Sequence, residues 1–213
     1  MDTNFQNWNP TMNLKSLLAA AALAFGATAA GASTITYQVR SIDNAIFGNY
    51  QSGFNAQSSP LASNSLSEFT NQFGQNNGYN HLSVNFEVGN VVAGSSVLFQ
   101  FAPDAGYGGA LFVNGVQQIS TGNDLWWGYD WNNTGELLSS SFANITQGLY
   151  TIDLYWAEGC CNGGQSARFS VGGGAWQALS VSNLDALAVP EPGSLALLGL
   201  ALSGLAAIRR KKA

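Results

Sequence analysis

Two adjacent cysteines and a lone histidine are the most reactive side chains of this 213-residue sequence. Cys160 and Cys161 are its only cysteines, and His81 is its only histidine. A catalytic cysteine needs a neighbouring base and an orienting group, and one histidine cannot complete a zinc set with two cysteines. We expect His81 to be a surface residue on a strand, so the sequence predicts no thiol-based active site.

The cysteine pair itself leaves three interpretations open. In an oxidising compartment, Cys160 and Cys161 can close a vicinal disulfide, a strained ring that would stiffen a turn. They can also remain reduced or form separate bridges, including bridges between chains. A metal or redox role is the third interpretation.

Residues 123–136 combine aromatic rings with short polar side chains, a mixture typical of surfaces that stack and hydrogen-bond sugars. In an extended segment successive side chains point in opposite directions, so Trp126 and Trp127 cannot both face a core. The alternative is that some of these rings cap the core. The candidate glycan-binding residues are Trp126, Trp127, Tyr129, Asp130 and Trp131.

A pair of carboxylates for glycoside hydrolysis could be chosen from this region. The four carboxylates that would serve are Asp124, Asp130, Glu136 and Glu158. A similar choice could be made in any chain with ten scattered carboxylates, so these four residues are weak evidence for an active site. We therefore expect a protein that is not an enzyme. A glycoside-active enzyme remains a remote alternative.

The charge of residues 33–189 excludes some partners. This stretch has two cations, Arg40 and Arg168, against ten Asp and Glu side chains, which gives a net charge of −8. A nucleic-acid partner is excluded because no basic face can be built to neutralise phosphates. Carboxylates leave divalent-cation binding open.

Short alternating apolar patterns predict an all-β fold, an antiparallel β-sandwich or a jelly-roll-like barrel. Residues 81–88 alternate without a fault, and Asn114-Gly115 is a strong hairpin signal between 111–113 and 116–119. Further strands are expected at 97–101, 150–156 and 167–171, with 179–181 closing the sheet. One short helix is expected at 65–73, where apolar residues recur at helical spacing.

The two ends predict sorting segments. Residues 1–32 read as a signal peptide with Met12 as the true start, a positive residue at Lys15, an apolar stretch at 17–25 and cleavage before Ser33. Residues 192–208 carry no charge and could cross a bilayer as a helix. The basic residues that follow would stay in the cytoplasm, so residues 33–189 would face outward. A buried hydrophobic helix is the alternative for this tail.

The tail, residues 190–213, resembles the PEP-CTERM sorting signal of Gram-negative bacteria. The resemblance rests on the order of an apolar helix between a Pro-Glu-Pro motif and a basic cluster: Pro190, Glu191 and Pro192, then Arg209, Arg210, Lys211 and Lys212. It implies recognition by an exosortase-like membrane protease and transient anchoring in the bacterial inner membrane, with the domain in the periplasm. Delivery to the cell surface or the extracellular biofilm matrix would follow.

Two further resemblances concern the body of the chain. Cys160-Cys161-Asn162-Gly163 resembles the Cys-Cys-x-Gly signature of a PEP-CTERM group called the CCXG family. Segments 101–106, 109–115, 148–152 and 167–169 are similar to the protective-antigen-type β-sandwich of flocculin adhesins. Lectin members of that group hold Ca²⁺ through two adjacent aspartates, and this chain has only Asp104 there, so Asp104 is the one candidate metal ligand.

We therefore expect an exported, non-enzymatic protein of the cell surface or of the polysaccharide-containing extracellular matrix, with no obligatory cofactor. The alternative is an adhesin-like carbohydrate-binding module, with Ca²⁺ as a possible aid.

Overall fold

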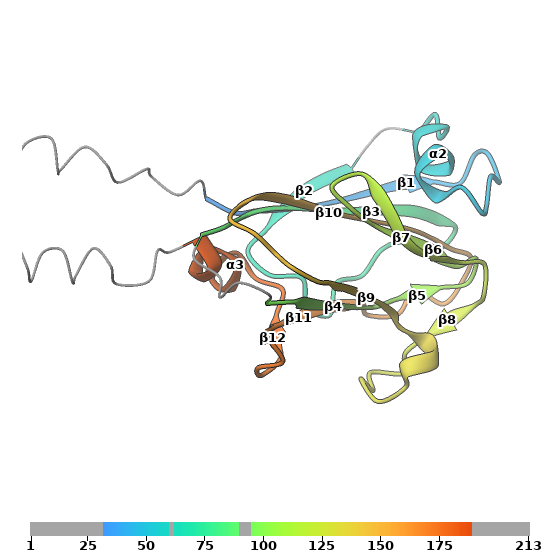
Figure 1. Cartoon of the computed structure of the whole chain (residues 1–213). Coiled ribbons are helices and arrows are strands. Elements are labelled where there is room, and N and C mark those ends of the chain that lie inside the picture. The colour runs from blue at the N-terminus through green and yellow to red at the C-terminus, as the bar shows by residue number, and fades with distance from the viewer. Residues whose placement is uncertain (1–31, 60–61, 90–94, 189–213) are drawn as a thin grey trace, which may run out of the picture.

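Two antiparallel sheets lie face to face in the computed structural model, which describes residues 32–59, 62–89 and 95–188 (Figure 1). The larger sheet has six strands in the order β2-β1-β3-β10-β6-β7. Its strands, in chain order, are β1 (Thr34–Ser41), β2 (Ala62–Leu66), β3 (Gly78–Val88), β6 (Gly109–Val113), β7 (Val116–Thr121) and β10 (Gly148–Glu158).

The smaller sheet faces it with the order β12-β11-β4-β9, and a two-stranded ribbon pairs β5 with β8. The strands of these sheets are β4 (Val97–Ala102), β5 (Asp104–Ala105), β8 (Leu125–Trp126), β9 (Leu138–Phe142), β11 (Ser166–Val171) and β12 (Gln177–Ala178). The helices are α2 (Tyr50–Asn55), a 3-10 turn at Thr134–Glu136 and α3 (Val181–Ala188). The predicted all-β sandwich is confirmed for the described residues.

Alternating side chains explain why β3 and β10 lie at the centre of the larger sheet. Leu82, Val84 and Phe86 of β3 are buried, whereas the residues between them are half-buried or exposed. β10 pairs with β3 along its whole length, from Gly148 opposite Val88 to Glu158 opposite Gly78. Because successive side chains of a strand point to opposite faces, every second side chain of β3 and β10 points into the space between the sheets.

The predicted hairpin also forms. Val113 pairs with Val116 across a two-residue turn, in which Asn114 and Gly115 have φ values of 49° and 76°. Both residues occupy the left-handed region that this turn requires, which explains the Asn-Gly pair.

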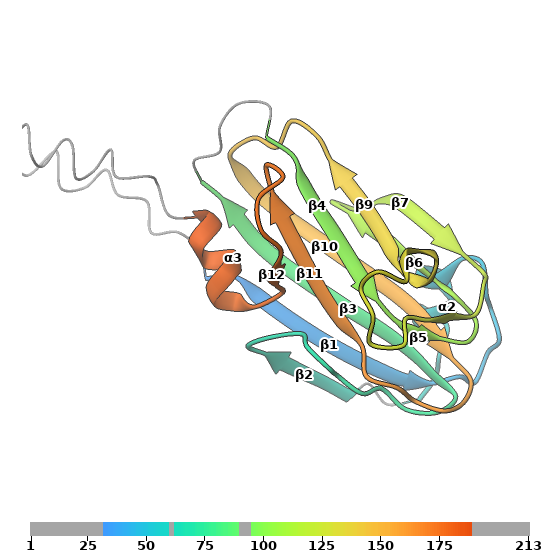
Figure 2. The same cartoon turned by 90° about the horizontal axis from the view of Figure 1, so that it is seen from below.

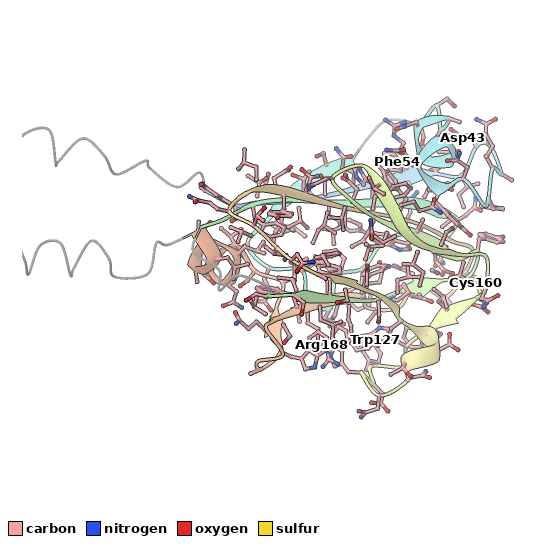
Figure 3. All side chains as sticks on the ribbon, viewed as in Figure 1. Asp43, Phe54, Trp127, Cys160 and Arg168 are labelled. Carbon is pink, nitrogen blue, oxygen red and sulfur yellow. The ribbon has the colours of Figure 1, made fainter. Side chains whose placement is uncertain are left out.

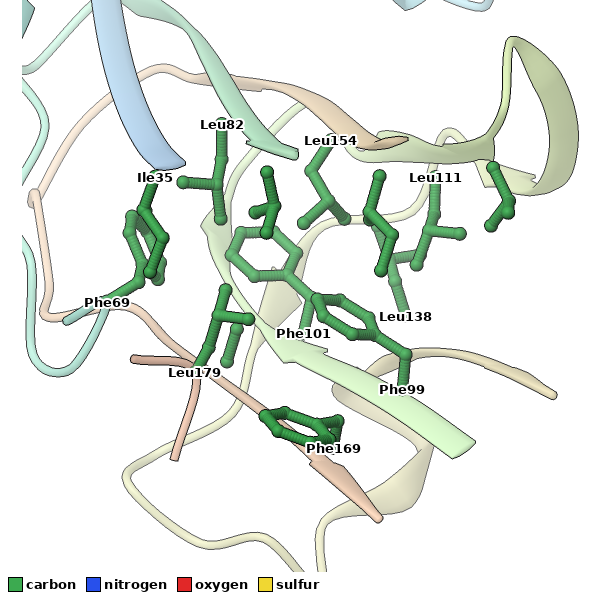
Figure 4. Close-up of a cluster of buried hydrophobic side chains, with 14 of the residues drawn as sticks. Ile35, Phe69, Leu82, Phe99, Phe101, Leu111, Leu138, Leu154, Phe169 and Leu179 are labelled. Atoms are coloured by element: carbon green, nitrogen blue, oxygen red, sulfur yellow. The ribbon is translucent and has the colours of Figure 1, made fainter. Parts of the chain in front are cut away.

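An aromatic cluster around Trp156 joins the two layers, and Figure 4 labels Phe69 and Phe101 of the same core. The Trp156 ring stacks on Tyr37 of β1 at 5.8 Å between centroids, and Phe101 of β4 meets it from the other sheet at 4.7 Å. Phe69, from the connection between β2 and β3, packs against the edge of Trp156 at 6.3 Å. The sheets are thus held together by rings from distant parts of the sequence.

The helix predicted at 65–73 is wrong. β2 ends at Leu66, and the chain then follows an irregular, bent path with isolated bridges from Glu68 to Ser180 and from Gln72 to Gln165. Phe69 is fully buried between the sheets. The backbone of this segment bonds to the smaller sheet, which satisfies its polar groups without a helix.

Two other details differ from the prediction. Strand β1 has no counterpart among the predicted strands. The closing strand is predicted at 179–181. The observed strand, β12, is shorter and lies earlier, at Gln177–Ala178, and Val181 is the first residue of α3.

The ends of the described domain meet at one pole. The backbone N–H of Ser33, just before β1, donates to the Asp185 carboxylate of α3 at 2.7 Å. Both views place α3 and the start of β1 side by side, at the end of the sandwich away from β5 and β8 (Figures 1 and 2). Whatever follows α3 therefore leaves from the pole opposite the β5–β8 ribbon.

The predicted signal peptide and C-terminal helix fall on residues 1–31 and 189–213, which lie outside the described ranges. Among the helices of the described ranges, none is long and apolar enough to cross a bilayer.

Replacing Trp156 by Ala should lower the free energy of unfolding by about 3–5 kcal/mol, since it leaves a cavity between the sheets. Leu149→Ala is the matched control, because Leu149 lies on the same strand but is 77% exposed, and it should change stability by less than ~0.5 kcal/mol. Urea unfolding of the two variants measures both effects. Equal losses in the two variants would contradict the role assigned to the ring cluster.

Candidate functional site

A cleft of about 750 Å³ opens beside β5 and β8. Figure 1 places these two strands at the end of the sandwich opposite α3. The cleft lies where the β5 segment, the β7–β8 connection and the turn after β10 meet, and Figure 3 labels Cys160 at this end of the molecule. Its lining consists of Asp104, Gly106, Tyr107, Asp124, Trp126, Glu158, Gly159, Cys160 and Cys161. Residues more than fifty positions apart in the sequence thus form one concave surface.

Two buried carboxyl groups hold these loops together. The Asp104 carboxylate accepts the backbone N–H of Gly163, and the Glu158 carboxylate accepts the backbone N–H of Gly106 at 2.7 Å. Both bonds join the same two segments, 104–106 and 158–163. Hydrogen bonds from backbone N–H groups to buried acceptors fix loop geometry because leaving either partner unpaired is costly.

Burial raises the pKa of both carboxyl groups above the ordinary range. For Asp104, desolvation outweighs the Gly163 N–H, which lowers the pKa, and the Asp124 carboxylate raises it further. For Glu158, desolvation likewise dominates over the Gly106 N–H, and the Asp104 charge adds to the rise in pKa. The site therefore favours a proton on this pair.

The two carboxyl groups lie near enough to influence each other, because the charge of Asp104 raises the pKa of Glu158.

Exposed aromatic rings form part of the cleft. Trp126 is 41% exposed, and the half-exposed Tyr107 is held by a stack against Phe47 at 4.4 Å between centroids. A Cβ atom at Gly163 would collide with the Trp126 ring. The glycine of the Cys-Cys-Asn-Gly segment is therefore needed for close packing of this turn against Trp126.

The predicted aromatic residues separate onto two surfaces. Trp126 lines the cleft, whereas Trp127 is only 4% exposed and its Nε1 donates to the Gly164 carbonyl at 2.8 Å. Trp131 packs on Trp127, and Tyr129 accepts the Gly164 N–H at 3.1 Å through its hydroxyl. The expectation that Trp126 and Trp127 face opposite ways is confirmed.

Asp130 lies outside both aromatic surfaces. Its exposed carboxylate accepts hydrogen bonds from the backbone and side chain of Asn132, within its own loop. Sequence reasoning missed Tyr107, which lies in a turn beside Gly106 and Gly108. The sequence feature that could have identified Tyr107 is an aromatic residue flanked by two glycines in a connection between strands.

The cysteines lie on the rim of the cleft as free, exposed thiols. Cys161 has a φ of 71°, a left-handed conformation in the turn that follows β10. The neighbouring Cys161 thiol raises the pKa of the Cys160 thiol, and the Glu158 and Asp104 carboxyl groups act in the same direction. The thiolate is thus disfavoured, and the vicinal disulfide stays a prediction.

His81 does not line the cleft. It is half-buried on β3, where its ring nitrogens lie 3.0 Å from Gln38 Oε1 and 2.9 Å from Asp153 Oδ1, and it stacks on Tyr155. The contacts of His81 are those of a residue that packs on the sheet.

The donor set around Asp104 does not fit a calcium site. In the part of the chain that the structure describes, no group of three or more acidic, histidine or cysteine side chains is arranged to hold a metal ion. Asp104 stands between Pro103 and Ala105 and spends one oxygen on the Gly163 N–H. Calcium needs six to eight oxygen ligands, more than the described side chains gather around Asp104. The role of Asp104 as a metal ligand stays a prediction.

The tail is identified by comparison with known families. Residues 188–211 match the model described as the PEP-CTERM protein-sorting motif. The chain carries a PEP-CTERM sorting motif. The motif indicates export, transient membrane anchoring and sorting by an exosortase. A search of curated proteins finds no match.

Solved structures similar to this chain include PA14 domains and an adhesin domain. A PA14 sugar-binding domain from an RTX adhesin has a TM-score of 0.50 at 11% identity, covering 71% of this chain and 97% of that one. The PA14 domain of the MpAFP antifreeze protein has a TM-score of 0.48 at 11% identity, covering 73% and 91%. The epithelial adhesin 6 A domain from Candida glabrata has 0.46 at 13%, covering 74% and 88%. At 11% identity, the RTX adhesin domain shows the fold.

The buried carboxyl pair predicts a stability that falls as pH rises. Because folding raises the pKa of Asp104 and Glu158, their contribution is fully present below about pH 4 and is lost as pH rises through the raised values. Asp104→Asn and Glu158→Gln keep an acceptor oxygen and should flatten this decline. Urea unfolding between about pH 4 and 8 measures the slope.

Asp130→Asn is the control, because it removes one exposed charge without touching the pair. It should leave the wild-type slope unchanged. A wild-type slope that the Asp104 and Glu158 variants do not alter would contradict the assignment.

Proposed function

We propose that this chain is an exosortase-sorted surface protein whose sandwich binds neutral carbohydrate of the extracellular matrix in the polar cleft. The single observation that carries the proposal is the cleft itself. It combines two accessible rings, Trp126 and Tyr107, with polar groups that are fixed before a ligand arrives.

The chemistry of the cleft suits a sugar. The apolar C–H face of a pyranose packs against an aromatic ring, and its hydroxyl groups need fixed donors and acceptors nearby. Trp126 supplies the ring, and the carboxyl groups of Asp104, Asp124 and Glu158 supply polar partners. A volume of about 750 Å³ lies within the range of ~300–1,000 Å³ that small ligands occupy.

The placement of the cleft also supports the proposal. The sorting motif begins at residue 188, the last residue of α3, and the cleft lies at the opposite pole. A chain held at its C-terminal end would present such a cleft away from the membrane. Matrix polymer would meet Trp126 before it met the anchored end.

A structural neighbour gives independent support. The RTX adhesin domain that shares this fold is described as sugar-binding. Fold similarity at 11% identity does not transfer a ligand, so the argument for this chain rests on the residues of its own cleft.

Glycan binding by the full chain in detergent tests the proposal. A glycan array selects the strongest neutral oligosaccharide, and titration calorimetry then measures its affinity. Trp126→Ala should weaken binding by about tenfold or more, equivalent to ~1.4 kcal/mol, because the stacking ring is gone. Phe73→Ala is the control, since Phe73 is an exposed ring outside the cleft and should have no effect.

Each titration is repeated with EDTA and with added Ca²⁺. Unchanged binding is expected, since the cleft residues contact the sugar directly. Loss of binding in EDTA would restore the calcium-assisted role of Asp104. No neutral glycan bound under any condition, or equal binding by wild type and Trp126→Ala, would overturn the proposal and leave a matrix scaffold.

A further inference from the structure

A second groove lies on the outer face of the smaller sheet. It has a volume of about 520 Å³ and is bounded by β11, β12 and the loop that carries Tyr129 and Trp131. Figure 3 labels Arg168 and Trp127 on this side of the molecule, away from Cys160. The groove and the polar cleft share no lining residue.

Arg168 is the centre of this groove. Its guanidinium carbon lies 4.1 Å from the ring centroid of Trp131 and 4.2 Å from that of Trp176. Its Nε and Nη2 both donate to Gln100 Oε1, at 2.9 and 2.7 Å. Two indole rings and one amide therefore fix the guanidinium plane.

These contacts use only one edge of the guanidinium. Arg carries five N–H donors in a planar fork, and Gln100 accepts from the Nε edge. Nη1 has no partner within the described ranges and is not buried, and the bond to Gln100 uses only one of the two hydrogens of Nη2. That open edge has the geometry that binds a carboxylate or sulfate through two parallel hydrogen bonds.

The charge on Arg168 has no counterion in the described part of the chain. The ion pair found there joins His81 to Asp153. Burial lowers the pKa of Arg168, but an arginine remains charged in proteins. A partly desolvated cation without an anionic partner is unusual in a domain with ten carboxylates, and it leaves the place of the anion to a ligand.

Arg40, the other cation of the domain, also forms no ion pair within the described ranges, but it differs from Arg168 in its hydrogen-bond partners. Its Nη1 donates to the carbonyls of Phe54 and Gln57, and its guanidinium packs on the Phe54 ring at 4.7 Å. Arg40 thus joins α2 to the larger sheet through contacts within the protein. Arg168 has an open edge beside a groove instead.

The groove also carries one acidic residue. Glu68 lines it and accepts a hydrogen bond from the Thr70 hydroxyl at 2.5 Å, but it forms no ion pair with Arg168. The groove therefore has separate positive and negative positions. An anionic ligand would therefore bind with its charged group at Arg168 and away from Glu68.

We propose that this groove is a second glycan site that binds an acidic sugar unit of the extracellular polysaccharide. The carboxylate or sulfate of the sugar would pair with the open edge of Arg168. Its ring would pack on Trp176 or Tyr129, which are 38% and 54% exposed. This site goes beyond the proposed function, because it uses other residues and another class of sugar.

The experiment compares two oligomers on the full chain in detergent. Hexagalacturonate and its fully methyl-esterified form have the same sugar rings but differ in charge. Titration calorimetry at low and moderate salt gives the affinities. The wild-type chain should bind the charged oligomer about tenfold or more tightly than the ester, and this preference should shrink as salt rises.

Four variants locate the interaction. Arg168→Gln and Arg168→Lys should both remove most of the preference, since the lysine keeps the charge but lacks the planar fork. Glu68→Gln should strengthen binding of the charged oligomer and leave binding of the ester unchanged. Trp126→Ala, in the polar cleft, should leave the affinity for the charged oligomer unchanged, and any loss of binding should fall on the neutral ester.

Thermal unfolding shows whether each variant keeps its fold. If the Arg168 variants fail to fold, two other results test the inference. One is the decrease of the preference as salt rises, and the other is the tighter binding of the charged oligomer by Glu68→Gln. The inference is overturned if wild type binds neither oligomer, if it binds both equally, or if folded Arg168→Gln keeps the preference. It is also overturned if Trp126→Ala removes the preference, which would place the acidic sugar in the polar cleft and leave the proposed function intact.

Discussion

Two carboxyl groups that are buried at one pole of the sandwich determine the shape of the candidate site. Asp104 and Glu158 lie on neighbouring loops, and each accepts the backbone N–H of a glycine on the other's segment. The same burial that raises their pKa values makes these hydrogen bonds valuable, because an unpaired N–H or carboxylate there would be costly. Gly163 lets the turn after β10 pack closely beside Trp126, since a Cβ atom at this position would collide with the ring.

The scaffold beneath these loops separates recognition from attachment. Rings centred on Trp156 hold the sheets together, and the Ser33–Asp185 hydrogen bond closes the pole from which the sorting motif continues. The loops of the opposite pole can vary without disturbing either feature. Such a division suits a surface domain that is anchored at one end and meets polymer at the other.

Much of the fold could be predicted because local patterns carry it. The alternation in β3 and the Asn114-Gly115 turn encode their structure within a few residues. The segment around Phe69 was misread because its helical spacing of apolar residues is overridden by one ring that inserts between the sheets. That insertion depends on partners far away in the sequence, such as Phe101 and Trp156.

The candidate site was predicted only in part for the same reason. The aromatic segment was recognised from its composition, but its division between two surfaces depends on how Trp127 bonds to Gly164. The hydrogen bonds of Asp104 to Gly163 and of Glu158 to Gly106 join segments more than fifty residues apart, and no short sequence pattern predicts them. The sandwich of Arg168 between Trp131 and Trp176 is equally a product of tertiary structure.

Hydrogen–deuterium exchange of the full chain, with and without its strongest neutral oligosaccharide, tests the central claim most directly. The account predicts that the sugar slows exchange at 104–108, 124–127 and 158–164, the three segments that enclose the cleft. Slowed exchange confined to other parts of the sandwich, or no change at saturating sugar, would contradict it.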